Sequence, residues 1–143
     1  MSNADVLSNV VEAFNDRDFD RVAGLVTDGC DFVDVAAGET SHGPDEIVAS
    51  FWMWANAFSD MAIETLNVAS TDRGAAGEFV GRGTHDGSLP APDGEIAPTG
   101  KRIEVRFSVL AEVEGERLAG FREYYDAMTL MAQLGLIPEP VES

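Results

Sequence analysis

The chain has 143 residues, 45% of them hydrophobic and 24% charged, which suits one domain with a sizeable core and is too short for two independent ones. Acidic residues outnumber basic ones by 26 to 9. The net charge of −17 argues against nucleic acid as a partner, because binding phosphates takes clustered Lys and Arg. No stretch approaches the roughly 18 apolar residues that a membrane span requires, so no membrane association is expected.

The carboxylates are spread along the whole chain rather than gathered in one segment. This spread favours adaptation to high salt, where the repulsion of a large net charge is screened, over a dedicated cation site or disorder. The first five residues lack the basic start and apolar run of a signal peptide, so a cytoplasmic location is expected. Cys30 is the only cysteine, which excludes an internal disulfide.

Apolar residues recur at helical spacing in the first part of the chain and predict helices over residues 5–14, 19–26 and 47–58. Gly43-Pro44-Asp45-Glu46 opens the third helix. Proline is tolerated in the first turn of a helix, and acidic residues are favoured near its positive end. This helix carries four aromatic side chains: Phe51, Trp52, Trp54 and Phe58. We therefore expect it to lie between a sheet and the interior rather than on an open surface.

Alternating residues predict strands in the rest of the chain, over residues 30–36, 61–70, 76–87, 101–113 and 118–125. A loop rich in Pro and Gly runs from Ser88 to Gly100, Glu114-Gly115-Glu116 forms a hairpin turn, and a helical turn follows over residues 127–134. Three N-terminal helices followed by a run of strands predict one α+β domain over residues 1–143. The helices would cover one face of a curved, mixed or antiparallel sheet and cap a cavity there.

The sequence contains no Gly-rich phosphate motif, no zinc-spaced Cys/His cluster and no serine nucleophile elbow. No cofactor and no metal are therefore predicted. Two possibilities remain: carboxylate chemistry, or a pocket that only binds a small molecule.

Asp126 is the leading candidate for carboxylate chemistry. It ends the aromatic strand Phe121-Arg122-Glu123-Tyr124-Tyr125-Asp126 and precedes an apolar segment, so desolvation would raise its pKa and suit it to general acid–base work. The structural alternative is that Asp126 caps the N-terminus of the helical turn that follows. The spacing of the sequence favours neither role over the other, and Asp126 can fill both.

His85 lies in Gly83-Thr84-His85-Asp86-Gly87, near the end of a predicted strand, and an imidazole there suits proton transfer or polarising a carbonyl. A lone histidine is more often a hydrogen-bonded structural residue. The aromatic residues of the third helix favour a core position, although one or two of them can line a cavity. The predicted substrate contacts come from this helix and the strands: Phe51, Trp54, Phe107 and Tyr124.

Three segments, in their order and spacing, resemble the SnoaL-like polyketide cyclases of the NTF2-like superfamily. The first is Gly43-Pro44-Asp45-Glu46-Ile47 leading to Ala57-Phe58-Ser59-Asp60, with Ser59 where the family usually has proline. The second is Gly83-Thr84-His85-Asp86-Gly87, followed after the loop by Pro98-Thr99-Gly100-Lys101. The third is Asp126 followed by Leu130 and Gln133-Leu134-Gly135.

The resemblance implies a cone-shaped fold around an apolar pocket and a cofactor-free intramolecular aldol cyclisation of a small carbonyl compound. In that chemistry the residue matching Asp126 takes a proton from an activated carbon and returns one to the forming alkoxide. His85 would match a pocket histidine that polarises a carbonyl. The resemblance also implies a homodimer formed through the outer face of the sheet. The loop from Ser88 to Gly100 is longer than the family pattern, which affects the rim of the pocket.

Two other functions remain open. The strand Gly120-Phe121-Arg122-Glu123-Tyr124-Tyr125-Asp126 also resembles a strand of the limonene-epoxide hydrolases, whose chemistry uses two aspartates bridged by an arginine. The neighbouring Arg82-Gly83-Thr84 lacks the second aspartate, which ranks hydrolysis lower. A non-catalytic small-molecule binder or dimerisation module of the same fold is the third possibility.

Overall fold

The computed structural model describes residues 1–91 and 93–138. Six strands form one curved sheet in the order β2-β1-β8-β7-β4-β3. Their bounds are β1 Val26–Asp34, β2 Glu39–His42, β3 Ala62–Ser70, β4 Gly74–Thr84, β7 Arg102–Glu114 and β8 Arg117–Tyr125. Neighbouring strands are antiparallel except β1 and β8, which run parallel. The sheet is therefore mixed, and the parallel pair brings residues about ninety positions apart into register.

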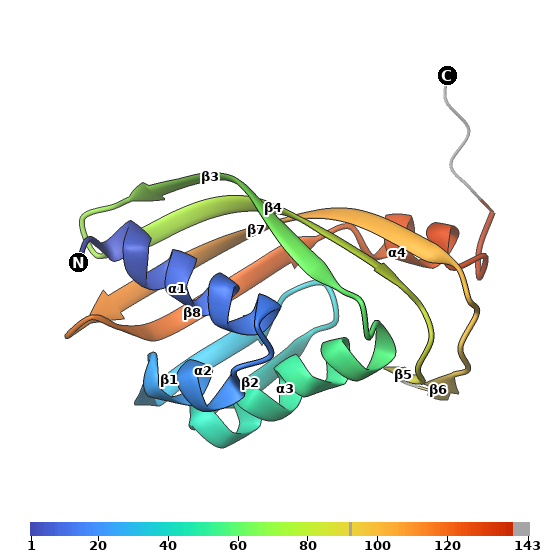
Figure 1. The fold of residues 1–143 in the computed structure, drawn as a ribbon, viewed down its shortest axis with the longest axis horizontal. Coiled ribbons are helices and arrows are strands. Elements are labelled where there is room, and N and C mark those ends of the chain that lie inside the picture. Colours follow the sequence, from blue (N-terminus) through green and yellow to red (C-terminus); the bar gives the residue numbers. More distant parts are fainter. Residues whose placement is uncertain (92, 139–143) are drawn as a thin grey trace.

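Three helices precede the long strands: α1 Asn3–Asn15, α2 Phe19–Gly24 and α3 Gly43–Ala57. Figure 1 shows them on one side of the sheet, where α1 packs against β3 and β4 while α3 packs against β1. A capping box starts α1: the Ser2 hydroxyl accepts from the Asp5 amide at 3.1 Å, and the Asp5 carboxylate accepts from the Ser2 amide at 3.0 Å. The buried face of α1 supplies much of the core: Val6, Leu7, Val10, Ala13 and Phe14.

The predicted α+β architecture is confirmed, with one difference in the number of helices. A fourth helix, α4 Ala127–Gln133, follows β8, where the sequence predicted only a helical turn. Three short strands were also missed. Strand β2 pairs with β1, and the predicted loop from Ser88 to Gly100 contains a small hairpin of β5 Leu89–Ala91 and β6 Gly94–Ile96. Strands this short give too few alternating positions to stand out in a sequence.

The hairpin turn between β7 and β8 is confirmed. Gly115 and Glu116 both have positive φ, at 57° and 63°. This backbone matches a two-residue turn whose twist suits the flanking strands, and it favours glycine at one of the two positions. Beyond the turn, the register shifts by one residue between Glu112 and Val113, and the resulting pairing places Ala111 opposite Phe121 and Val109 opposite Glu123. It thereby sets which residues of β8 face the helices.

None of the helices in the described part of the chain is long and apolar enough to cross a membrane.

Candidate active site

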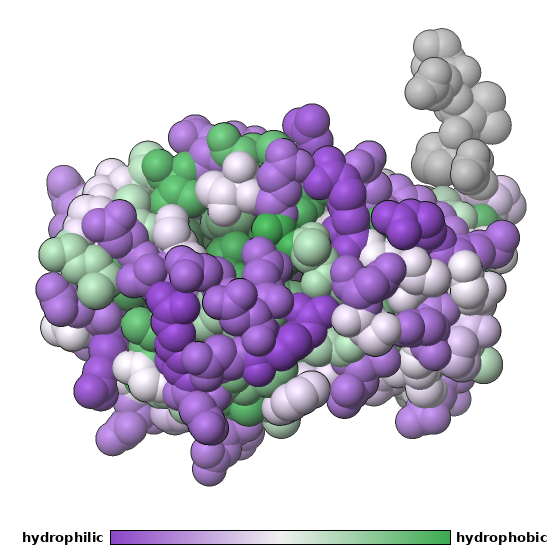
Figure 2. Space-filling view, viewed as in Figure 1, coloured by the Kyte–Doolittle hydropathy of each residue, from purple (hydrophilic) through white to green (hydrophobic). Residues whose placement is uncertain are grey.

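A cavity of about 110 Å³ lies between the helices and the inner face of the sheet. Figure 2 shows a hollow with hydrophobic walls, surrounded by hydrophilic surface, on the face of the molecule that carries α1. The lining comes from α1, α3, α4 and most strands of the large sheet, and nearly all of it is aliphatic or aromatic: Leu7, Val10, Val11, Phe14, Phe32, Phe51, Trp54, Met61, Ile63, Gly81, Ile103, Val105, Phe107, Val109, Phe121, Glu123, Tyr125 and Leu130.

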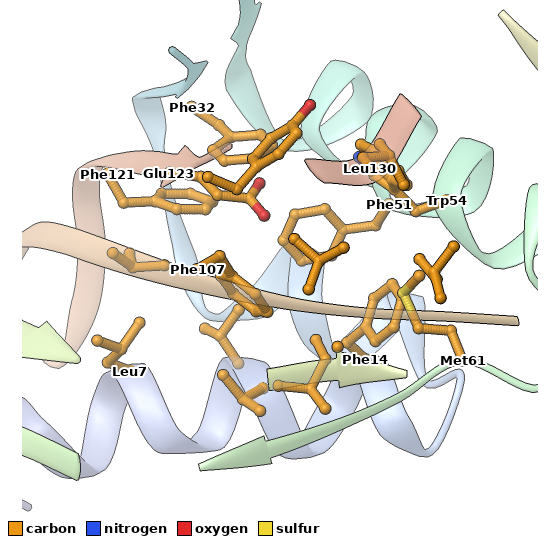
Figure 3. A pocket seen from close by; sticks show the side chains of 18 residues that line it. Leu7, Phe14, Phe32, Phe51, Trp54, Met61, Phe107, Phe121, Glu123 and Leu130 are labelled. Atoms are coloured by element: carbon orange, nitrogen blue, oxygen red, sulfur yellow. The ribbon is translucent and has the colours of Figure 1, made fainter. Parts of the chain in front are cut away.

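Glu123 is the one acidic side chain among the described residues that line this cavity. Figure 3 shows its carboxyl directed from β8 into the space beside Phe51 and Phe107. Burial among these apolar walls raises the pKa of Glu123 to about 8, with a smaller contribution from the negative charge of Asp34. A carboxyl with this pKa holds its proton at neutral pH and exchanges it readily, which are properties of an acid–base group.

Asp34 lies next to Glu123 on the neighbouring strand. The two residues are partners in the parallel register of β1 and β8, so their side chains project from the same face of the sheet. Asp34 is buried, at 7% exposure, and accepts hydrogen bonds from the Ala37 amide at 3.0 Å and the Tyr125 hydroxyl at 3.1 Å. Burial raises the pKa of Asp34, and these two hydrogen bonds oppose part of the rise.

Three of the four predicted substrate contacts line the cavity: Phe51 and Trp54 from α3, and Phe107 from β7. Tyr124 does not, and the structure places it 42% exposed on the outer face of the sheet. Its neighbours Glu123 and Tyr125 face the cavity, and successive residues of a strand point to opposite faces. Trp52, in the aromatic helix, is also exposed at 44% and packs on Phe19.

Asp126 does not line the cavity. It is the N-cap of α4, accepting hydrogen bonds from the Met128 amide at 3.0 Å and the Thr129 hydroxyl at 2.8 Å. Its side chain is exposed, and these hydrogen bonds hold the pKa of Asp126 below its usual value, the one from Thr129 contributing most. The predicted rise in its pKa is therefore wrong, because solvent and donors surround it, and the alternative role as a helix cap is confirmed.

His85 lies outside the cavity lining as well, so it and Asp126 do not share an enclosed site. The ring is fully buried against Phe58, with 5.2 Å between ring centroids. Its Nδ1 accepts a hydrogen bond from the Thr99 amide at 3.1 Å and lies 3.0 Å from the Thr99 hydroxyl. The backbone of His85 also pairs with Gly100 and Lys101. These contacts tie the end of β4 to the segment before β7.

Glu123 and Asp34 were not singled out by the sequence analysis. The signal for Glu123 was present: it stands two residues from Phe121 and two from Tyr125, and such positions share one face of a strand. Asp34 gave no comparable signal, because its proximity to Glu123 depends on the parallel pairing of distant strands. Among the described residues, no group of three or more His, Cys, Asp or Glu is arranged to hold a metal ion.

Comparison with known proteins agrees with this architecture. The model of the SnoaL-like polyketide cyclase family matches residues 4–134. The chain belongs to the SnoaL-like polyketide cyclase family. No curated protein sequence matched it. Among solved structures, a proposed SnoaL-like polyketide cyclase from Jannaschia sp. CCS1 is similar at a TM-score of 0.83 and 15% identity, over 95% of this chain and 93% of that one.

Two further structures share the fold. IdmH from Streptomyces antibioticus, a proposed polyketide cyclase, has a TM-score of 0.78 and 22% identity, over 94% of this SnoaL-like chain and 99% of its own. An LEH-like epoxide hydrolase of M. tuberculosis has a TM-score of 0.71 and 14% identity, over 92% of this chain and 88% of its own. At these identities the likeness is one of fold, which confirms the predicted class of architecture and leaves the reaction to the residues of the cavity.

Proposed function

We propose that this SnoaL-like protein is a cofactor-free proton-transfer enzyme for a small, mostly apolar carbonyl compound, with Glu123 as its acid–base residue. The observation that supports this proposal is the position of Glu123, an acidic side chain with a pKa of about 8 in an otherwise apolar cavity. A carboxylate of this basicity removes a proton from a carbon next to a carbonyl better than an ordinary one does, and about a tenth of Glu123 is ionised at pH 7.

The family's chemistry fits this arrangement as an intramolecular aldol ring closure. Ionised Glu123 would take a proton from a carbon beside one carbonyl, and the carbanion would attack a second carbonyl of the same molecule. The proton held by Glu123 would then pass to the new alkoxide, so the enzyme ends as it began. The buried indole nitrogen of Trp54, a lining residue, has no acceptor among the described residues, and a ligand carbonyl is a group that could supply one.

The dimensions of the cavity support a small substrate. A cavity of about 150 Å³ in another protein binds benzene, so about 110 Å³ suits a compound of roughly one ring, with any larger part extending toward the opening. The walls are apolar and the protein carries a charge of −17, which disfavours anionic compounds. A neutral dicarbonyl of this size meets both conditions.

The test is exchange of the acidic protons of acetylacetone and 1-phenyl-1,3-butanedione for deuterium, followed by NMR in D₂O buffer. The wild-type protein should accelerate exchange, and Glu123→Gln should remove the acceleration while the far-UV spectrum stays the same. Asp126→Asn is the matched variant, because asparagine also caps helices. If Asp126→Asn loses activity and Glu123→Gln keeps it, the acid–base role returns to Asp126 as the sequence predicted, with His85→Gln as the next variant to measure.

Epoxide hydrolysis is the second candidate, favoured by the pair of carboxyls on β1 and β8. Asp34 is a second acidic group beside Glu123, on β1 rather than on the strand of Arg82 where the sequence analysis looked for one. No arginine lines the cavity among the described residues. The two arginines on the strands next to it are paired elsewhere: Arg82 bonds to Glu64, and Arg122 bonds to Glu112. We therefore expect no diol when the protein is incubated with limonene oxide or styrene oxide, as followed by gas chromatography. Diol formation that depends on Glu123 would favour the hydrolase.

The homodimer also stays a proposal. The outer face of the sheet exposes apolar side chains from three strands: Leu66, Leu110 and Tyr124. Pairing of two such faces would bury them, and light scattering coupled to size exclusion would measure a mass near twice 15.3 kDa. A charged substitution, Leu110→Glu, should then give the monomer mass. A binding module without catalysis would bind the diketones yet leave their proton exchange unchanged.

A further inference from the structure

We propose that Asp34 is the positioning residue of this site: its fixed negative charge, held by Tyr125 and Ala37, keeps the proton on Glu123 at rest. This inference rests on the proposed function of Glu123 but concerns a different residue. The geometry comes from two strands: Asp34 and Glu123 are register partners on β1 and β8, and adjacent strands lie about 4.8 Å apart. Both side chains project toward the helices, and Asp34 is buried.

The hydrogen bonds decide which of the two carboxyls is ionised. Asp34 accepts from the Ala37 amide through Oδ1 and from the Tyr125 hydroxyl through Oδ2, so each of its oxygens has a donor. Glu123 has no stabilising donor in the described part of the chain, and burial and the charge of Asp34 are the causes that act on its pKa. Two like charges this close do not both ionise readily. Asp34 therefore carries the charge, and Glu123 carries the proton.

Among the residues that the structure describes, no positive charge acts on the pKa of either carboxyl. On β8, Tyr125 stays a neutral donor, because burial and then the charge of Asp34 raise its pKa. The nearby acidic group on β2, Glu39, adds negative charge that raises the pKa of Asp34. The side chains of α1, α3, α4 and β7 that line the cavity are not titratable. Arg122, the basic residue next to Glu123 in sequence, faces the outer side and pairs with Glu112.

The consequence for catalysis is a stronger base. When Glu123 gives up its proton it becomes an anion beside another anion, and it regains stability by taking a proton from the substrate. Asp34→Asn keeps the shape and an oxygen for the Ala37 amide but removes the charge. The midpoint of the Glu123 titration should fall by about one unit, the lower bound for a like charge at this range. The plateau of kcat at high pH should fall several-fold with KM unchanged.

The experiment follows the side-chain carboxyl of Glu123 by ¹³C NMR, assigned by difference from Glu123→Gln, alongside the pH profile of diketone exchange. The control is Asp31→Asn, which removes the same charge from the same strand at an exposed position, where Asp31 pairs with His42. We expect Asp34→Asn to move both the NMR midpoint and the pH profile to lower pH, and Asp31→Asn to move neither. An unmoved Glu123 midpoint in Asp34→Asn overturns the proposal.

A second variant covers the case in which Asp34→Asn folds poorly. Tyr125→Phe removes one donor from Asp34, so part of the proton should pass from Glu123 to Asp34. The Glu123 signal at pH 6.5 should then move toward its ionised position, and no movement would count against the proposal. The NMR readout needs no turnover, which separates the two claims. If Glu123→Gln keeps full activity while Asp34→Asn still shifts the titration, the proposed function fails and the coupling of the two carboxyls stands.

Discussion

Replacing Glu123 by glutamine should make the folded protein more stable at neutral pH while it removes the acid–base group. Burial raises the pKa of Glu123 from 4.5 to about 8, so the folded protein must keep a proton that the unfolded chain releases at neutral pH. Glutamine has nearly the same shape and carries no charge at any pH. The substitution also breaks no hydrogen bond seen in the described part of the chain, so this cost is removed without a compensating loss.

The sign and size follow from the two pKa values. Below pH 4.5 both states are protonated and Glu123 imposes no penalty, whereas between pH 4.5 and about 8 the folded state binds more protons and loses stability as the pH rises. Each pH unit in this window costs about 1.4 kcal/mol, so the penalty at pH 7 is on the order of 3 kcal/mol. Residual access of water to the cavity reduces this figure. Above about pH 8 the difference is constant.

Urea unfolding of the wild type and of Glu123→Gln at several pH values between 4 and 9 measures this penalty. The four carboxyls whose pKa is lowered, Asp5, Asp60, Asp86 and Asp126, change the stability only near and below pH 4, and they do so equally in both proteins, so the difference between the two proteins reports on Glu123. It should be near zero at pH 4 and grow in favour of Glu123→Gln up to about pH 8. A difference that stays flat with pH, or favours the wild type, would refute a protonated Glu123 in the cavity of the folded protein.

Three other outcomes follow from the same structure. Asp126→Ala should lower the melting temperature because α4 loses its N-cap, whereas Asp126→Asn should restore it, as thermal circular dichroism can measure. Gly81→Ala should weaken diketone binding in calorimetry without unfolding the protein, because the added Cβ takes up space in the cavity and stands 3.6 Å from the Phe107 ring, in ordinary contact. His85→Ala should cost about 2–4 kcal/mol in urea unfolding yet leave exchange activity per folded molecule intact, as expected of a buried structural ring.

The architecture was predictable because its elements are long and their apolar spacing is regular. The alternation of β7, with Ile103, Val105 and Val109 buried, is the kind of pattern that survives folding unchanged. The same alternation in β8 placed Glu123 beside Phe121 on the inner face. The sequence analysis chose Asp126 instead, because a strand-ending aspartate before an apolar segment looks desolvated. Helix α4 begins at the next residue and turns that aspartate toward solvent.

The carboxyl pair was beyond such reasoning for a topological reason. Asp34 and Glu123 meet only because β1 inserts parallel to β8, and nothing local in either strand specifies that partner. Local periodicity reports which face a side chain takes within its own strand, whereas the identity of the neighbouring strand is set by the packing of the whole sheet. A site made by two strands from opposite ends of the chain therefore stays hidden until the sheet order is known.

The segments that carry the family resemblance turn out to hold the cavity together. Asp126 caps α4, whose Leu130 forms part of the cavity wall. Gln133 fixes the other end of that helix by bonding both the amide and the carbonyl of Glu104, at 2.7 and 2.9 Å. His85 ties β4 to the segment that leads into β7. A motif of this kind identifies a scaffold, because its residues are bound to their backbone neighbours. The reacting group should instead be sought among side chains that face the cavity with their hydrogen-bonding capacity unused, and Glu123 meets that description.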